Sequence, residues 1–165
     1  MHINSKDNPR VKLFRKLLSS KKARDEQELF AVEGARNCVD TAYEAICGRI
    51  KVHSVFYTQT ALKKYESTLK VDNLFSCARP EDTFEISDEL AKKMTDEGSS
   101  QGIYMIAYKV DLPFAAENID KNGKYLVLDN LQDPGNLGTL LRTADAVGVS
   151  GVVMTDNCVD LYNPK

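Results

Sequence analysis

The sequence predicts an α/β protein in which a small mixed domain is followed by the beginning of a second domain with a parallel sheet. Strand-like and helix-like segments alternate over residues 1–110, and residues 111–123 have the Pro, Asn, Asp and Gly content of a linker. Residues 124–165 then hold two continuously apolar strands around one helix. Strands without alternation are typical of a parallel sheet that is covered on both faces, so this last part predicts a βαβ unit.

Length and composition indicate a globular protein. The chain has 165 residues, of which 42% are hydrophobic and 28% are charged, so there is enough apolar material for a core. No apolar run approaches the roughly 20 residues that span a bilayer, and the N-terminus lacks the apolar stretch of a secretion signal. The expected location is therefore the cytoplasm. Four cysteines without a Cys-x-x-Cys pair favour buried, reduced thiols over disulfides or a zinc site.

The first domain is expected to begin with a helix at Pro9, because Val11, Phe14 and Leu17 recur at helical spacing. The remaining elements follow from apolar runs, caps and glycines. In chain order they are a strand at 29–32, a helix from Gly34 to Gly48, a strand at 50–57, a helix from about 61 to 69, a strand near 73–77, a helix that Ser87 starts, and a central strand at 102–108.

The second domain is expected to contain a strand at 125–128, a helix from about Leu137 to Val147 that ends at Gly148, and a strand at 151–154. A lone βαβ unit cannot bury both faces of its strands. Either a partner completes this sheet, or the chain is a fragment of a longer protein. We favour the fragment.

Positive charge is concentrated near the N-terminus. Between Lys6 and Arg24, eight basic residues are opposed only by Asp7, although the whole chain has a net charge of −2. Such an asymmetry indicates a polyanionic partner, because binding to phosphates releases counterions. The alternative is a solvated helix face. The basic residues after Lys6 are Arg10, Lys12, Arg15, Lys16, Lys21, Lys22 and Arg24.

The most informative segment runs from Asn130 to Arg142, at the carboxyl end of the first strand of the parallel sheet, where ligands of such sheets gather. Pro134 and Gly135 predict a tight turn, and Asn136 is expected to cap the helix. Helical spacing places Arg142 away from the apolar stripe, on the same side as Gly138, one turn earlier. The alternative is that Arg142 pairs with Asp145 in a surface ion pair of little energetic value.

The string Asn130-x-x-Asp133-Pro134-Gly135-Asn136-x-Gly138-x-x-x-Arg142-x-Ala144 resembles the first signature motif of the SpoU/TrmH branch of the SPOUT methyltransferases. The front of the chain resembles the substrate-binding domain that precedes the catalytic domain in many members. The segments that carry this second resemblance are 8–12, 30–36 and 101–103. That domain is similar to the ribosomal protein L30e fold. The resemblance thus implies an L30e-like domain at 1–110, a linker at 111–123, and at 124–165 the first βαβ unit of a trefoil-knot SPOUT domain, apparently truncated.

The resemblance implies methyl transfer from S-adenosylmethionine to a ribose 2′-hydroxyl of RNA, most readily ribosomal RNA. It assigns a catalytic role to Arg142, with Asn136 shaping the same corner. A guanidinium stays protonated, so Arg142 would anchor phosphate and stabilise the developing oxyanion rather than act as a base. The resemblance also adds Glu33 and Arg36 to the basic N-terminal residues as RNA contacts, and it implies a homodimer of the full-length protein. The family's two later motifs do not occur in these residues, so a complete cofactor pocket is not expected here and its residues are unknown.

Other classes of function explain less of the sequence. A non-catalytic L30e-like RNA-binding module accounts for the basic segment but not for Asn136 and Arg142 at motif spacing. The chain has no Gly-x-Gly-x-x-Gly, no P-loop and no Gly-x-Ser-x-Gly, which disfavours a nucleotide-binding enzyme or a hydrolase. His2 and His53 are isolated and are expected to be structural or on the surface, and neither a metal site nor a membrane contact is expected.

Overall fold

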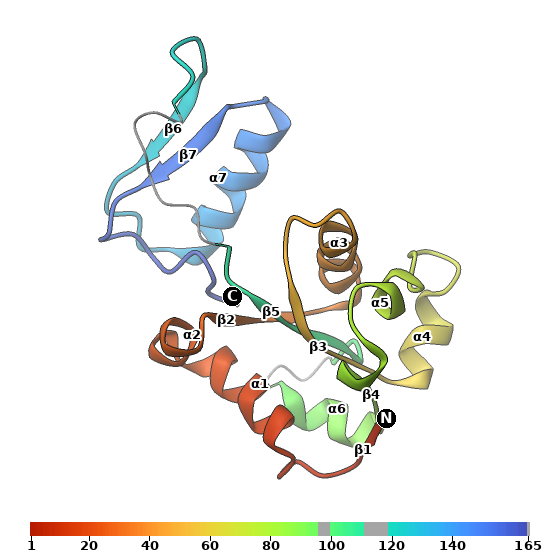
Figure 1. Ribbon diagram of the computed structural model, residues 1–165. Helices are drawn as coiled ribbons and strands as arrows, with labels where there is room; N and C mark the ends of the chain where they lie inside the picture. Colours follow the sequence, from red (N-terminus) through yellow and green to blue (C-terminus); the bar gives the residue numbers. More distant parts are fainter. Residues whose placement is uncertain (96–99, 111–118, 165) are drawn as a thin grey trace. The chain divides into compact units, whose positions relative to one another are not determined.

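The computed structural model describes residues 1–95, 100–110 and 119–164. The chain divides into two compact units, Met1–Val110 and Asp111–Asn163 (Figure 1). Each unit has its own sheet. Residues 111–118 of the expected linker lie outside the described residues, and 119–123 form a loop.

The first unit is built on a mixed five-stranded sheet in the order β1-β4-β3-β5-β2. The strands β1, β4 and β3 run parallel, whereas β5 runs antiparallel to both of its neighbours, β3 and β2. Their bounds are β1 His2–Ile3, β2 Leu29–Glu33, β3 Val52–Tyr57, β4 Thr83–Ile86 and β5 Ile103–Tyr108. The expected position of residues 102–108 inside the sheet is confirmed.

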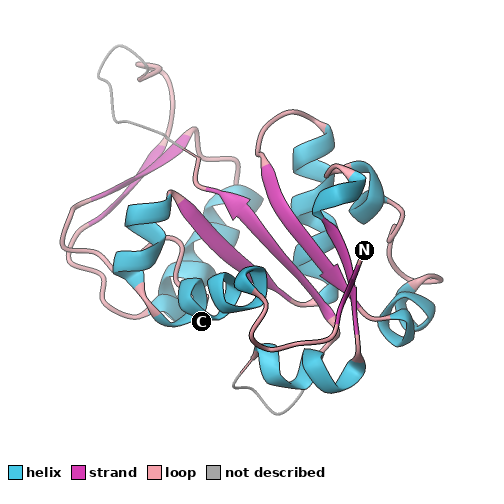
Figure 2. Ribbon diagram, turned by 60° about the horizontal axis from the view of Figure 1, so that its bottom comes forward, coloured by secondary structure: helices cyan, strands magenta, loops and turns pink. Residues whose placement is uncertain are grey.

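Helices cover both faces of this sheet (Figure 2). On one face, α1 (Pro9–Ser19) and α6 (Asp88–Met94) pack with the strands around Phe14 and Phe56. On the other face, α3 (Ala35–Ile46), α4 (Gln59–Tyr65) and α5 (Asn73–Ser76) pack around Val55 and Leu74. The helix α2 (Lys21–Gln27) follows α1 directly. Successive β5 side chains point to opposite cores, which explains why this strand is apolar without alternation.

Two expected elements of the first unit need correction, and the strand β4 (Thr83–Ile86) was not predicted. Residues 73–77 do not form a strand; they form the short helix α5, held by turn bonds such as Cys77 N to Asn73 O at 3.0 Å. The strand in this part of the sheet is β4, preceded by the 3-10 helix η1 (Pro80–Asp82). The helix expected at 61–69 runs from Gln59 to Tyr65, because Thr58 caps it through the amide of Ala61.

The second unit consists of β6 (Tyr125–Leu128), α7 (Pro134–Ala146) and β7 (Gly151–Met154). The two strands pair in parallel, with Leu126 opposite Val152, so the predicted βαβ unit is confirmed. The apolar stripe expected for α7 consists of Leu137, Leu140, Leu141, Ala144 and Val147. It holds in part: Leu137 and Ala144 are buried and Leu140 and Leu141 are half-buried, but Val147 is 68% exposed. Val147 is the C-terminal cap of α7 and therefore does not share the orientation of the helical residues before it.

The cysteines are all unpaired, as expected, but they are not all buried: Cys38 is buried, whereas Cys47 is exposed. Burial raises the pKa of the Cys38 thiol well above its usual value. Among the described residues, no helix has the length and apolar character needed to cross a membrane, and no group of three or more side chains could hold a metal ion.

Candidate functional site

The candidate catalytic segment begins in a loop that follows β6. Asn130 adopts a left-handed backbone, with a φ of 51°, and its amide donates to the hydroxyl of Thr155 at 3.3 Å. The same hydroxyl donates to Asp129 at 3.0 Å, and the side-chain amide of Gln132 donates to the carbonyl of Asn157 at 2.6 Å. Since β6 and β7 are parallel neighbours, both partners of these bonds lie at the carboxyl edge of the sheet. The loop after β6 is thus fastened to the loop after β7.

Asp133, not Asn136, caps the helix α7. Its carboxylate accepts a hydrogen bond from the amide of Asn136 at 2.6 Å, and α7 starts at Pro134, three residues before the expected start. The prediction of Asn136 as the cap is therefore wrong. The physical reason is that proline is well suited to the first helical position, where its fixed φ fits and its missing N–H costs nothing. Asn136 lies in the first turn and is exposed.

The guanidinium of Arg142 lies close to the backbone of α7. Its Nη2 donates to the hydroxyl of Thr139 at 3.3 Å, and its Nη1 is 3.3 Å from the position of a Cβ built on Gly138. Arg142 is exposed, and no carboxylate of the described residues is within ion-pair distance, so the alternative pair with Asp145 does not form. The group presents N–H donors and a full positive charge to a ligand.

The basic N-terminal segment forms two helices. Ser20 has an extended backbone that ends α1, and its hydroxyl caps α2 by accepting from the amide of Ala23 at 3.2 Å. Two of the residues that were predicted to contact RNA, Arg24 and Arg10, instead make contacts within the protein. Arg24 is 4% exposed and donates to the carbonyl of Leu17 at 2.6 Å. Arg10 donates to the hydroxyl of Ser54 in β3 and pairs with Asp82 in η1.

The exposed cations of these two helices are Lys12, Arg15, Lys16, Lys21 and Lys22. Two of them have carboxylate partners: Lys12 pairs with Asp7 at 2.9 Å, and Lys22 with Glu26 at 3.7 Å. Both pairs are exposed, and exposed pairs contribute little and are screened by salt. The exposed cations of α1 and α2 therefore form a basic surface that is suited to binding phosphate groups.

The segments around Glu33 and Gln101 meet at the end of β2. The side-chain oxygen of Gln101 accepts from the amide of Ala35 at 2.9 Å, and the amide of Gly34 donates to the carbonyl of Ile103 at 3.2 Å. Gly34 has a φ of 97°, a left-handed value that favours glycine at this turn into α3. Arg36, in the first turn of α3, is exposed. Two segments far apart in the chain thus form one corner.

Sequence reasoning missed the fastening role of Gln132 and Thr155 and the capping role of Asp133. Asp133 could have been found, because an Asp directly before a Pro at the start of an apolar periodic segment is a typical helix start. The bond between Gln132 and the backbone of Asn157 joins residues 25 apart in the chain and has no local signal.

The loop after β6 that leads into the capped helix α7 lies at the edge of a parallel sheet where proteins of this class usually bind their ligands. Comparison with known proteins is more specific. Residues 8–105 match the family of MRM3-like substrate binding domains, and residues 123–165 match the SpoU rRNA Methylase family. The chain belongs to the family of SpoU-type methylases that carry an MRM3-like substrate-binding domain.

Individual relatives agree with this assignment. The chain is 34% identical to an uncharacterized tRNA/rRNA methyltransferase of Synechocystis, over 99% of this chain and 56% of that protein. It is 30% identical to the 23S rRNA (guanosine(2553)-2'-O)-methyltransferase RlmP of Bacillus subtilis, over 99% of this chain and 58% of that protein. Among solved structures, an rRNA methyltransferase from Sinorhizobium meliloti superimposes with a TM-score of 0.76 at 28% identity, over 99% of this chain and 57% of that chain. Its AdoMet-bound form gives 0.74.

The chain spans a little more than half the length of these relatives. The polar groups at the carboxyl ends of β6 and β7, those of Asp129, Asn130 and Thr155, bond to one another. The described residues therefore do not by themselves fit a complete pocket for S-adenosylmethionine.

Proposed function

We propose that this chain is the RNA-binding part and the beginning of the catalytic part of an S-adenosylmethionine-dependent RNA 2′-O-ribose methyltransferase, and that its substrate is ribosomal RNA. The family assignment supports methyl transfer. The printed activity of the Bacillus subtilis relative supports the ribose of ribosomal RNA as the acceptor, and the AdoMet-bound Sinorhizobium meliloti structure supports the methyl donor.

The observation that carries this proposal is the position of Arg142. A ribose hydroxyl is a poor nucleophile, so an enzyme must hold it in line and stabilise the charge that develops as its proton leaves. Arg142 offers a charged donor that no described carboxylate neutralises, on an exposed helix surface where a polymer has access. It anchors a phosphate of the substrate and stabilises the developing oxyanion. Asn136, exposed in the first turn of the same helix, shapes this corner.

The experiment uses the full-length protein, ribosomal RNA and S-adenosylmethionine with a labelled methyl group. Replacing Arg142 with Ala should lower turnover by on the order of 10²-fold or more and leave RNA affinity nearly intact, because the lost interaction acts mainly in the transition state. The matched control is Asp145→Ala, one turn further along α7, which should retain turnover. Unchanged turnover in Arg142→Ala would refute the role.

The exposed cations of α1 and α2 favour a second function for these residues, RNA binding without catalysis by the chain alone. Arg15, Lys16 and Lys21 are exposed on consecutive helices, which is the arrangement expected for contacts along a phosphate backbone. We propose that this surface, together with Glu33 and Arg36 at the corner near Gln101, binds the substrate RNA. An affinity that does not depend on salt would contradict this role.

The full-length protein is further proposed to be a cytoplasmic homodimer. The dimer is supported by the family resemblance, and the cytoplasmic location by the four unpaired cysteines, which are typical of a reducing compartment. Light scattering of the full-length protein tests the first statement, and cell fractionation tests the second.

A further inference from the structure

We propose that a basic cleft in the first unit binds an unpaired segment of the RNA, with phosphate on its cations and a base against the rings of Tyr108 and His53. The cleft has a volume of about 1220 Å3. Its lining includes Arg10, Arg49, Lys51, His53, Arg79 and Tyr108. The inference rests on the proposed function and goes beyond it by adding a contact surface.

The cleft lies at the end of the sheet where β3 begins and β5 ends, since the amide of Tyr108 donates to the carbonyl of Lys51 at 2.9 Å. The corner around Gly34 lies at the other end of β5, where Gly34 donates to the carbonyl of Ile103. A strand of six residues separates the two places by about 20 Å. The cleft is therefore distinct from the RNA contacts proposed at Glu33 and Arg36.

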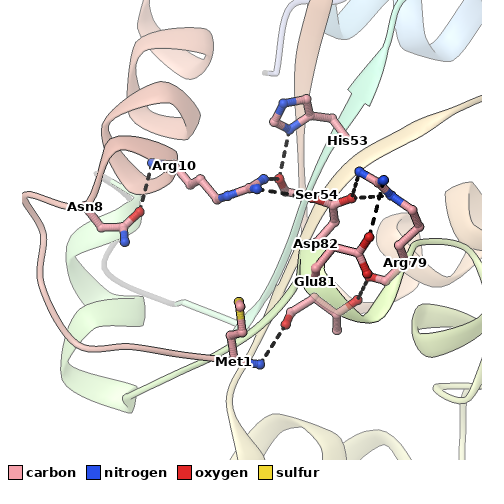
Figure 3. A network of polar contacts seen from close by, with 9 residues as sticks. Met1, Asn8, Arg10, His53, Ser54, Arg79, Glu81 and Asp82 are labelled. Atoms are coloured by element: carbon pink, nitrogen blue, oxygen red, sulfur yellow. Dashed lines mark hydrogen bonds and ion pairs between the residues drawn. The ribbon is translucent and has the colours of Figure 1, made fainter.

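Cations outnumber carboxylates in the lining of the cleft. Asp82 is shared by two guanidinium groups, that of Arg10 at 3.2 Å and that of Arg79 at 2.8 Å (Figure 3). Glu81 also contacts Arg79, at 3.3 Å, so two carboxylates face these two guanidinium groups. The guanidinium of Arg49 is paired with the carboxylate of Glu44. Lys51 is exposed and has no carboxylate of the described residues within ion-pair distance. Lys51 therefore gives the cleft a positive charge that no described carboxylate pairs, and a phosphate can bind to it.

The hydrogen bonds around Ser54 are compatible with a neutral His53 ring. The Nη1 of Arg10 is only a donor, so the hydroxyl of Ser54, 2.9 Å away, must accept from it. The proton of that hydroxyl is then available to Nδ1 of His53, at 2.8 Å (Figure 3). This arrangement suits a neutral His53 ring that carries its proton on Nε2. Burial and the charge of Arg10 both lower the pKa of His53, in agreement with a neutral ring.

A neutral imidazole beside a phenol is suited to a nucleobase. The rings of His53 and Tyr108 have centroids 5.9 Å apart and planes tilted by 56°, and Tyr108 is 41% exposed although it is a large apolar side chain in a strand. Single-stranded nucleic acids commonly bind where aromatic side chains lie next to a positively charged groove, because every base has a face that can stack on an aromatic ring. Paired bases keep their faces stacked within the duplex, so the geometry selects unpaired RNA.

The size of the cleft agrees with a polymer. Sites for small molecules enclose about 300–1,000 Å3, and this cleft exceeds that range.

The test measures fluorescence anisotropy of the 165-residue chain with two labelled probes, a short single-stranded RNA of mixed sequence and the duplex of the same sequence. Tyr108→Leu keeps apolar bulk but removes the ring, and it should weaken single-strand binding by about fivefold or more. The duplex affinity should change less. Lys51→Ala should reduce the slope of log affinity against log salt by about 0.7, the value for one phosphate contact of a single strand.

Both substituted side chains are exposed, and thermal melts should confirm that the variants fold. The matched control is Lys93→Ala, an exposed lysine on α6 outside the lining, which should leave affinity and salt slope unchanged. Wild-type affinity in both cleft variants, or an equal loss for duplex and single strand in Tyr108→Leu, overturns the cleft. If the full-length protein methylates RNA while these results are negative, the proposed function stands and only the cleft inference fails. If the wild-type protein neither binds nor methylates RNA, both fail.

Discussion

The guanidinium of Arg142 lies over Gly138, one turn earlier on α7, with Nη1 at 3.3 Å from the position that a Cβ on this glycine would take. Thr139 holds the same group through its hydroxyl, at 3.3 Å from Nη2. A glycine inside a helix costs stability, because it loses more backbone entropy than alanine does. Here the missing side chain allows the guanidinium to lie against the helix.

Replacing Gly138 with Ala should therefore have opposite effects on stability and activity. The unfolding free energy should rise by about 0.5–1 kcal/mol, because alanine is the better helix former. The methyl group requires the exposed Arg142 tip to shift, so methyl transfer by the full-length protein should fall. Thermal denaturation and turnover with labelled S-adenosylmethionine measure the two effects. In an Arg142→Ala background the same change should no longer affect turnover, and a further loss there would contradict the proposed coupling.

A second prediction concerns the start of α7. The carboxylate of Asp133 accepts from the amide of Asn136 at 2.6 Å, so Asp133→Ala should lower the unfolding free energy of the second unit by about 0.5–2 kcal/mol. Asn136→Ala should cost less, since no capping bond is lost. Chemical denaturation, followed by a probe in the second unit, measures both. A larger loss in Asn136→Ala would restore Asn136 as the cap.

How far the sequence could predict this structure depends on how local each signal is. The βαβ unit at 125–154 was predictable because continuous apolar strands and a helical stripe are properties of neighbouring residues. The helix α5 was not, because Leu74 is its only buried residue and four residues are too few to show a period. The sequence also does not show that Arg24 is buried and donates to the carbonyl of Leu17. A run of basic residues has the same appearance in the sequence when all of its side chains are exposed to solvent.

In the candidate site, too, only the features with a local sequence signal could be predicted. Spacing placed Arg142 outside the core, and the structure agrees, but the loop that supports this helix is held by a contact between residues 25 apart. The basic cleft joins the start of α1, the start of β3 and the loop after α5, segments that only the fold brings together. No local pattern predicts such a surface.

A third prediction contrasts two glycines with left-handed backbones. Gly102 has a φ of 72°, and a Cβ there would lie 2.8 Å from the hydroxyl oxygen of Thr58 and 2.9 Å from Cβ of Ala61. Both neighbours are buried, so Gly102→Ala should destabilise the first unit by about 2–4 kcal/mol, from backbone strain and overpacking together. Gly34 has a φ of 97°, but its nearest neighbour would be 3.5 Å away, so Gly34→Ala should carry only the strain, about 1–3 kcal/mol. Urea denaturation measures the loss of unfolding free energy in each variant. Equal losses would contradict the extra cost that we assign to steric overlap at Gly102.

The last prediction concerns pH. The folded state lowers the pKa of His53 below its ordinary value of 6.5, through burial and the charge of Arg10, against the opposing effect of Asp82. The unfolded chain then binds a proton more readily than the folded one does, so the unfolding free energy falls as the pH drops below about 6.5. One group contributes at most about 1.4 kcal/mol per pH unit. His53→Gln, whose amide oxygen can still accept from Ser54, should remove this contribution. Asp25, whose pKa is lowered by its bond with Lys109, adds a separate loss only near and below its ordinary value of 3.8. Urea denaturation of wild type and variant between about pH 7 and pH 5 isolates the histidine, and parallel curves over that range would show that His53 is not the titrating group.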